Sequence, residues 1–241
     1  MSTRVFVDGA CSPGALVTIP AQDARHLAVV LRAERGDAIV VVADGRAWQA
    51  RLETLDKDAM TARVVEAVHE RREFPVPLAV LQALPKGNKM DDVVEKVTEL
   101  GATRIVPVRC AQSYGSDAPA KIKRWRRIAR AAAAQSQRSI VPQVDDAMDL
   151  TLALTAFAKD AHVLVAWERA PLGSLASSLE RADVDRALAI VVGPEGSFSH
   201  EELEEIRRLR CDLVSLGPTT LRTETAAAAA IAAVAALRSW W

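Results

Sequence analysis

The stretch Leu188–Phe198, LAIVVGPEGSF, decides the fold together with Leu216–Ala226, LGPTTLRTETA. In each stretch an apolar strand ends in a turn of glycine and proline that leads into a helix. Such turns leave backbone N–H and C=O groups with little side-chain cover, which suits a flat ligand that forms hydrogen bonds. Two such turns close together in the sequence predict a cofactor pocket, and therefore an enzyme.

The first turn is Gly193-Pro194-Glu195-Gly196, directly after an apolar strand that ends at Val192. In open α/β sheets, ligands bind at the carboxyl ends of the strands. The turn is therefore a candidate cofactor site, although glycine and proline could also serve only to connect the strand to a helix. It matches neither of the glycine-rich patterns that bind dinucleotides and nucleoside triphosphates.

In the second turn, a structural role explains two residues but not Arg222. Thr223 is expected to cap the last helix, and Glu224 lies in its first turn, where the helix dipole favours acidic residues. Arg222 is predicted to bind a negative charge, on a carboxylate, a phosphate or an electron-rich base oxygen. The candidate cofactor-binding residues of the two turns are Val192, Gly193, Pro194, Glu195, Gly196, Leu216, Gly217, Thr220, Leu221 and Thr223.

From residue 78 onward the chain alternates short apolar strands with helices. A capping box, Ser199 with Glu202 three residues later, predicts the start of one helix. This alternation predicts an α/β domain with a parallel sheet covered on both faces. The predicted strands are 78–84, 104–108, 162–167, 188–193 and 213–217, and the predicted helices are 90–101, 120–136, 200–209 and 226–237.

Residues 1–70 show short runs rich in β-branched residues between turn signals, which predict a small barrel. Asp44-Gly45 predicts a β-hairpin, and helical spacing over Asp23–Leu31 predicts one helix. The charged, proline-containing segment His69–Pro77 indicates a linker. We therefore expect a β-barrel domain over 1–72 and an α/β domain over 73–241. The runs predicted as strands are 4–8, 15–19, 37–44, 47–53 and 59–68.

Composition excludes several classes of protein. The three cysteines and four histidines are scattered through the 241 residues, which argues against a disulfide framework and against a metal site. No apolar run approaches the roughly 20 residues that span a bilayer, so we expect no membrane association. The first residues lack the apolar core of a signal peptide, so we expect a cytoplasmic protein.

Basic and acidic residues balance at 31 each, but their distribution is uneven. Seven basic residues and no acidic one lie between Lys121 and Arg138. This run indicates either an RNA-binding face or a solvated helix surface. The same two interpretations apply to the other candidate phosphate-binding residues, which are Lys86 and Lys89 in a loop and Arg4, Arg25, His26 and Arg32 in the predicted barrel.

Four motifs resemble, in order and spacing, the bacterial ribosomal RNA small-subunit methyltransferase E family: LPKGNKMDDVVEKVTELGATRIVPV, AAAAQSQRSIVPQV, VVGPEGSFSHEE and LGPTTLRTETAAA. The resemblance covers the whole chain. It implies an N-terminal PUA-like RNA-binding β-barrel and a C-terminal SPOUT α/β domain with a trefoil knot. The chain departs from the family at Ser197, where glycine is usual, and at Ala111–Gly115, where an arginine-serine stretch is more frequent.

The resemblance implies that S-adenosylmethionine is the cofactor and that N3 of a uridine in 16S ribosomal RNA of the small subunit is methylated. Uridine N3 must lose a proton to become a nucleophile. We expect Arg222, with Arg138 from either subunit, to stabilise the uridinate. Glu224 or Glu195 is the candidate base. The family also implies a homodimer, for which the last helix with Trp240 and Trp241 is a candidate surface, unless these side chains pack internally.

Two other classes of function stay open on the sequence alone. In one, the chain is a different nucleotide-binding enzyme whose turn at Gly193 holds phosphate with Lys86 and Lys89; preferential binding of ATP or NAD would indicate it. In the other, the chain is an RNA-binding adaptor without catalytic activity. An RNA product without any added methyl group would indicate the adaptor.

Overall fold

The computed structural model of the chain describes residues 3–56, 60–70, 72–115 and 117–241. The chain divides into two compact units: residues 1–73 with Ala133–Ile140, and Phe74–Ala132 with Val141–Trp241. Ala59, the first residue of the run predicted over 59–68, and Arg71 of the predicted linker lie outside the described residues.

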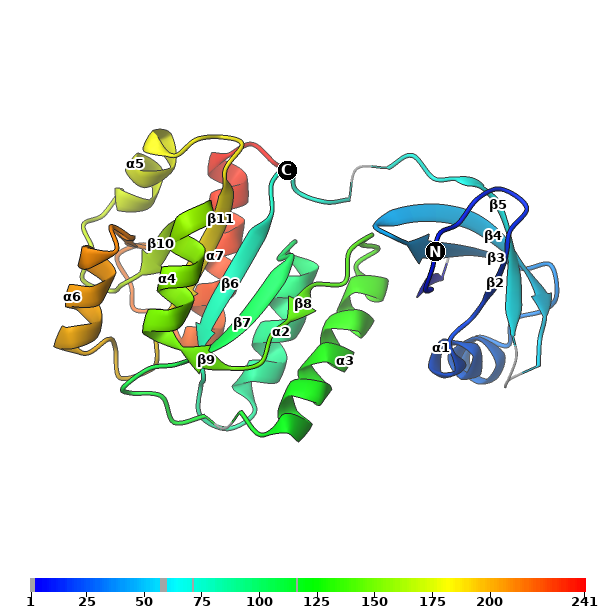
Figure 1. Cartoon of the computed structure of the whole chain (residues 1–241), viewed down its shortest axis with the longest axis horizontal. Coiled ribbons are helices and arrows are strands. Elements are labelled where there is room, and N and C mark those ends of the chain that lie inside the picture. The colour runs from blue at the N-terminus through cyan, green and yellow to red at the C-terminus, as the bar shows by residue number, and fades with distance from the viewer. Residues whose placement is uncertain (1–2, 57–59, 71, 116) are drawn as a thin grey trace. The chain divides into compact units, whose positions relative to one another are not determined.

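The first unit contains a curled five-stranded sheet (Figure 1). Its strands, in order across the sheet, are β1 (Arg4–Phe6), β3 (Ala38–Ala43), β4 (Arg46–Thr54), β5 (Thr61–Ala67) and β2 (Leu16–Thr18). The strand β1 pairs parallel to β3, and the other pairs are antiparallel. Asp44 and Gly45 form the predicted two-residue hairpin, with φ values of 48° and 73° that suit this turn.

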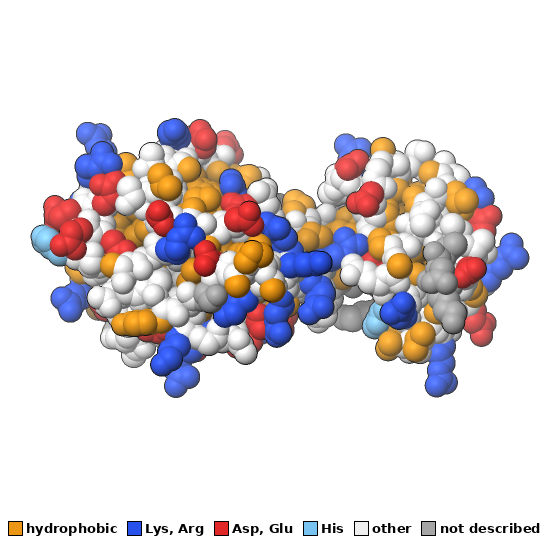
Figure 2. Space-filling view, turned by 60° about the horizontal axis from the view of Figure 1, so that its bottom comes forward, with side chains coloured by type: hydrophobic (Ala, Val, Ile, Leu, Met, Phe, Trp, Pro, Cys, Tyr) orange, Lys and Arg blue, Asp and Glu red, His pale blue; other side chains and the backbone are white. Residues whose placement is uncertain are grey.

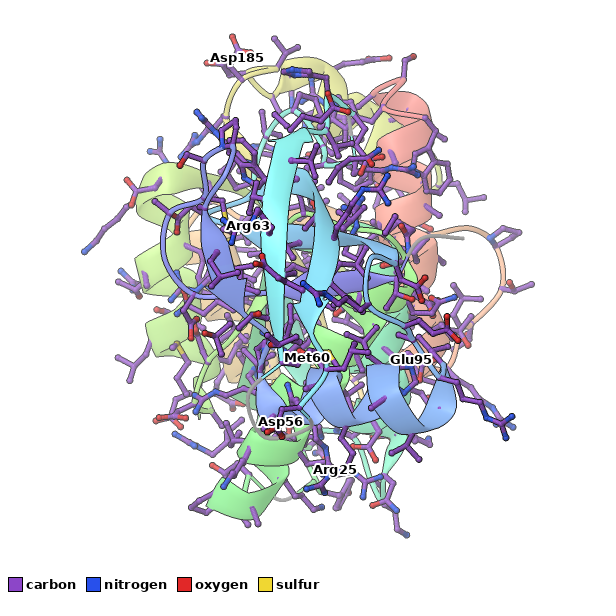
Figure 3. All side chains as sticks on the ribbon, turned by 90° about the vertical axis from the view of Figure 1, so that its right-hand side faces the viewer. Arg25, Asp56, Met60, Arg63, Glu95 and Asp185 are labelled. Carbon is purple, nitrogen blue, oxygen red and sulfur yellow. The ribbon has the colours of Figure 1, made fainter. Side chains whose placement is uncertain are left out.

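One short helical segment packs on the concave side of this sheet and covers its core. It consists of α1 (Ala21–Arg25) and a π-helical turn, η1 (His26–Val30), so it begins two residues before the helix predicted over Asp23–Leu31. Leu27 and Met60 are fully buried between the helical segment and the strands, and Figure 3 looks onto this unit with Arg25 and Met60 labelled.

The second unit contains a seven-stranded sheet in which every pairing is parallel, as predicted. The order across the sheet is β12-β10-β11-β6-β7-β8, with the short strand β9 also paired to β7. Their bounds are β6 (Leu78–Ala83), β7 (Arg104–Arg109), β8 (Gln143–Val144), β9 (Met148–Asp149), β10 (Ala161–Ala166), β11 (Ala187–Val192) and β12 (Asp212–Val214).

Helices cover both faces of this sheet, which confirms the predicted architecture (Figure 1). Leu78 and Val80 of β6 face a core shared with α2, α3, α5 and α7, whereas Ala79 and Leu81 face a core shared with α4 and α6. Strand residues alternate between the faces, so a strand buried on both sides is apolar throughout. The helices are α2 (Lys89–Glu99), α3 (Pro119–Gln135), α4 (Leu150–Asp160), α5 (Ser174–Arg181), α6 (His200–Arg208) and α7 (Thr223–Leu237).

The strands β12, β10 and β11 are neighbours, so the three loops that follow them lie at the same edge of the sheet. The loop after β11 leads into α6, which begins with the predicted capping box of Ser199 and Glu202. The loop after β12 leads into α7, which packs against α2 and β11. No helix in the described part of the chain is long and apolar enough to cross a membrane.

Candidate active site

A cavity of about 390 Å³ lies at the carboxyl edge of the parallel sheet. Three segments line it: 166–168 after β10, 192–198 from the end of β11, and 215–223 after β12. The two glycine/proline turns that the sequence singles out therefore face one cavity. All of the predicted cofactor-binding residues except Gly196 contribute to its wall.

Close packing explains the glycines of the first turn. A Cβ on Gly193 would lie 2.8 Å from the ring of Phe198, and a Cβ on Gly196 would lie 3.0 Å from Cβ of Gln112. Gly196 therefore packs closely against the loop that holds Gln112, and it does not line the cavity. Any larger residue at Gly193 would displace the Phe198 ring from the cavity wall.

Thr223 joins the two turns. Its Oγ1 donates a hydrogen bond to the carbonyl oxygen of Gly193 at 3.0 Å and accepts one from Nε2 of Gln82 at 2.8 Å. The prediction that Thr223 caps α7 is wrong, because Arg222 is the N-cap residue and no side chain caps this helix. Gln82 is fully buried in β6, and sequence analysis missed it. The sequence feature that could have identified Gln82 is its position as the single polar residue of an otherwise apolar strand.

Arg222 is exposed and lines the cavity. Its carbonyl oxygen accepts hydrogen bonds from the backbone N–H groups of Thr225 and Ala226 at the start of α7. Within the described part of the chain, no hydrogen bond or ion pair involves its guanidinium group. The guanidinium is therefore available to an anionic group of a ligand or substrate.

Lys89, at the start of α2, lies between the two carboxylates considered as bases. Its Nζ is 3.1 Å from Oε1 of Glu195 and 3.6 Å from Oε2 of Glu224. The hydrogen bond to Glu195 is the main cause that raises the pKa of Lys89. Since these carboxylates occupy its ammonium group, Lys89 does not suit the phosphate-binding role predicted for it. Lys86, which precedes it in the same loop, is exposed, so phosphate binding by Lys86 stays a prediction.

The two candidate bases differ in their surroundings. Burial raises the pKa of Glu195, but hydrogen bonds from Lys89 and from backbone N–H groups, including that of Lys86, outweigh it and lower the pKa overall. Oε2 of Glu224, in contrast, is buried and accepts no hydrogen bond from the described residues. Among the described residues there is no group of three or more side chains that could hold a metal ion.

The cavity has a third wall that sequence analysis did not assign, formed by Ala166, Trp167 and Glu168. These residues follow the apolar strand β10, so the end of a third strand at the same edge was the available signal. Ser197, the departure from the family pattern, also lines the cavity, and its Oγ donates a hydrogen bond to Oε1 of Glu168 at 2.8 Å.

Two of the predicted functional arginines have structural roles within the first unit. The guanidinium of Arg138 is buried and binds Glu73, with Nε 3.1 Å from Oε2. Arg4 is also buried, donates to the carbonyl oxygen of Arg138 at 3.1 Å and pairs with Glu70. Burial and its carboxylate partner correct the expectation for Arg4, which is not presented to phosphate. The guanidinium of Arg138 is bound to Glu73, and a contribution of Arg138 from a second subunit stays a prediction.

The other predicted RNA-binding residues of the first unit are exposed. Arg25 (Figure 3) and His26 lie on the α1–η1 segment, and Arg32 follows it. On α3 the basic run is partly neutralised, because Arg124 pairs with Asp91 at 2.7 Å and other basic side chains also have acidic partners. Figure 2 shows Lys and Arg side chains interspersed with Asp and Glu on the face that it draws.

The α/β unit with its cavity and the small curled-sheet unit both match domain families of RNA methyltransferases. An RNA methyltransferase domain family matches residues 72–235, and an RNA methyltransferase PUA domain family matches residues 19–65. Ribosomal RNA small subunit methyltransferase E of Bacillus subtilis is 32% identical over 229 residues, which are 90% of this chain and 88% of the relative. The enzyme of the same name from Mycobacterium bovis is 32% identical over 246 residues, with 98% and 92% covered.

The chain therefore belongs to the ribosomal RNA small subunit methyltransferase E family, as the resemblance of its motifs predicted. Solved structures agree with this assignment and confirm the predicted combination of a PUA-like unit and a SPOUT α/β unit, while the knot stays a prediction. The family's structure from Neisseria gonorrhoeae, bound to S-adenosyl methionine, has a TM-score of 0.88 at 30% identity and covers 98% of each chain. A putative methyltransferase from Legionella pneumophila, in complex with the cofactor SAM, has a TM-score of 0.82 at 26% identity and also covers 98% of each chain.

Proposed function

We propose that this chain transfers a methyl group from S-adenosylmethionine to N3 of a uridine in 16S ribosomal RNA of the small subunit. The observation that carries the proposal is the joint cavity of the two turns, linked by the hydrogen bond from Thr223 to Gly193, with the guanidinium of Arg222 beside it. The family's name and the cofactor bound to the Neisseria gonorrhoeae relative support the reaction and the cofactor.

The cavity fits an adenosine group by its shape and its lining. Gly217 has a φ of +131°, and a Cβ there would meet no atom within 4 Å, so this residue leaves open space where any other would place a side chain. Leu216 and Leu221 supply apolar contacts, and the backbone of the two turns supplies hydrogen bonds. When bound, S-adenosylmethionine supplies an electrophilic methyl group on a positively charged sulfur.

The chain's own residues have to make uridine N3 nucleophilic. Removal of the N3 proton leaves a negative charge that spreads onto O2 and O4 of the base. The guanidinium of Arg222 donates hydrogen bonds to this charge, and one such preorganised donor lowers a barrier by about 3 kcal/mol. Arg138 of the same chain has no part in this step, because its guanidinium is bound to Glu73.

In this proposal the general base is Glu224 and not Glu195. Hydrogen bonds lower the pKa of Glu195, which makes it a weaker proton acceptor. Oε2 of Glu224 accepts no hydrogen bond from the described residues, and Nζ of Lys89 lies 3.6 Å from it. Glu224 is not among the residues that line the cavity, so this role requires its carboxylate to turn towards the substrate.

The first unit is proposed to bind the ribosomal RNA around the target. Arg25, His26 and Arg32 are exposed on one helical segment and its end. In the α/β unit, the exposed Lys86 is a separate candidate for a phosphate contact. Phosphate contacts of this kind weaken as salt concentration rises. The target uridine has to leave its stack to reach N3, which favours an unpaired region of the RNA.

A homodimer with a C-terminal trefoil knot, in the cytoplasm, completes the proposal. The chain leaves the edge strand β12 and returns through α7 to pack on α2 and β11, which supports a threaded C-terminal segment. Trp240 packs internally on Phe74, with ring centroids 4.8 Å apart, whereas Trp241 is 69% exposed. The exposed end of α7 is therefore the candidate subunit contact, and sedimentation at micromolar concentration tests it; a monomer would contradict it.

The experiment that tests the proposed reaction uses labelled S-adenosylmethionine with small ribosomal subunits and, in parallel, with naked 16S RNA. Mass spectrometry of the digested nucleosides should detect 3-methyluridine in at least one of the two substrates. A different methylated nucleoside would contradict the N3 assignment, and unlabelled RNA from both substrates would contradict methyl transfer altogether.

A further inference from the structure

The cavity carries one carboxylate that the proposed reaction does not use, that of Glu168. The other carboxylate on the cavity wall, that of Glu195, accepts a hydrogen bond from Lys89 at 3.1 Å, so its charge is compensated. Glu168 has only Arg169 as an ion-pair partner among the described residues, with Nε 3.8 Å away on a side chain that is 78% exposed. An ion pair this exposed contributes little interaction energy. Glu168 therefore presents its negative charge to the cavity.

Ser197 fixes the position of this carboxylate. Its Oγ donates a hydrogen bond to Oε1 of Glu168 at 2.8 Å, which joins the turn after β11 to the segment after β10. Ser197 has a φ of 65°, in the left-handed region that disfavours residues with a Cβ. Glycine would adopt this conformation without strain but could not donate the hydrogen bond. A serine at this position therefore lowers the stability of the backbone, but its hydroxyl group provides the hydrogen bond that holds Glu168.

The sheet order places Glu168 between the two ligand-binding turns. The end of β10 lies between the end of β12, which leads to the loop over 215–222, and the end of β11, which leads to the turn at Gly193. An adenine held by the loop over 215–222 and a reactive sulfur near the turn at Gly193 would place the ribose between them. A carboxylate at that point faces a pair of neighbouring hydroxyl groups.

We infer that Glu168 accepts hydrogen bonds from the ribose hydroxyls of the cofactor and that Ser197 is its positioning residue. The inference rests on the proposed function, because it takes an S-adenosyl compound as the ligand. Oε2 of Glu168 is not used by Ser197, and Oε1 retains a second lone pair, so the carboxylate can accept both hydroxyls. A site of this kind discriminates against a ligand that lacks one hydroxyl, because its polar groups are then left without a partner.

The test is a calorimetric titration with S-adenosylhomocysteine and with its analogue that lacks the ribose 2′-hydroxyl. The wild-type chain should bind the full ligand about 10-fold more tightly than the analogue, as a hydrogen bond to a charged group predicts. In Glu168→Gln, binding of the full ligand should weaken about 10-fold, and the difference between the two ligands should fall to about 2-fold. A wild-type preference that persists in Glu168→Gln would overturn the inference.

Substitutions of Ser197 separate positioning from a merely structural role. Ser197→Gly should raise the melting temperature and yet weaken binding of S-adenosylhomocysteine about 3- to 10-fold, since it relieves strain and removes the hydrogen bond. Ser197→Ala should weaken binding equally without the gain in stability. In both variants KM for S-adenosylmethionine should rise while kcat at saturation stays constant. Ser197→Gly binding as tightly as the wild type would overturn the positioning role.

Arg169→Gln is the matched control, because it removes the exposed partner of Glu168 and leaves Ser197 in place. Its affinity for S-adenosylhomocysteine should stay within about 2-fold of the wild type. The failure of the inference differs from the failure of the proposed function. If the wild-type chain binds the ligand and Glu168→Gln binds it equally well, the inference alone is overturned; a wild-type chain that does not bind it overturns both.

Discussion

The link between the two turns predicts the effect of Thr223→Val, which keeps the shape of the side chain and removes its hydroxyl group. Thr223 is 6% exposed, and the substitution removes two buried hydrogen bonds, one to the Gly193 carbonyl and one from Gln82. Nε2 of Gln82 keeps its hydrogen bond to the carbonyl oxygen of Ala83 at 3.0 Å, so this amide group loses only one of its two hydrogen-bond partners. At about 1 kcal/mol for each hydrogen bond, the free energy of unfolding should fall by about 2 kcal/mol.

For a domain of this size, that loss lowers the Tm by about 4–8 °C, which a thermal melt followed by circular dichroism measures. The affinity for S-adenosylmethionine should also fall, because the Gly193 turn loses its link to the loop that precedes α7. Thr223→Ser keeps the hydroxyl and should retain most of the affinity. Thr225→Val is the matched control, since Thr225 is exposed two residues further on in the same helix. If Thr223→Val is as stable as Thr225→Val, the hydrogen bonds do not hold the turns together.

Three further predictions concern the cavity and its rim. Arg222→Ala should lower kcat about 100-fold and leave binding of S-adenosylmethionine nearly unchanged, as single-turnover kinetics and calorimetry measure; full activity would remove Arg222 from the mechanism. Gly193→Ala should weaken cofactor binding, because its Cβ would lie 2.8 Å from the Phe198 ring, and unchanged affinity would contradict the close packing. Lys89→Met should raise the pKa of Glu195 towards its ordinary value of 4.5, and NMR titration checks the direction. Since the folded-state pKa of Glu195 is lowered, its pairing with Lys89 stabilises the chain above pH 4.5, and this contribution is lost as the pH falls further; a Lys89→Met variant with wild-type acid stability would contradict the pairing.

Local patterns predicted the elements well, because their causes lie within a few residues. The Asp44-Gly45 turn connects β3 and β4 as expected, and Ser199 with Glu202 starts α6. The strand predicted over 188–193 ends at Val192, whereas the strand predicted over 213–217 ends at Val214 and its last three residues belong to the cavity loop.

Pairings between distant residues could not be predicted in the same way. Thr223 looks like a helix cap in sequence, and its true partner Gln82 lies 141 residues away. Arg4 and Arg138 look like any other arginines, and only the fold shows that Glu70 and Glu73 bind them. The carboxylates that surround Lys89 likewise come from separate elements. A charge in a sequence carries no information on whether the fold will bury it beside an opposite charge.

A crystal structure of this chain with S-adenosylhomocysteine tests the central claim most directly. The adenine should lie against the backbone of residues 216–221, with the ribose within hydrogen-bond distance of Glu168 and the sulfur nearer to the turn at Gly193 than the adenine is. Density for the ligand at any other place on the chain, with the space between the two turns filled by side chains, would contradict this account.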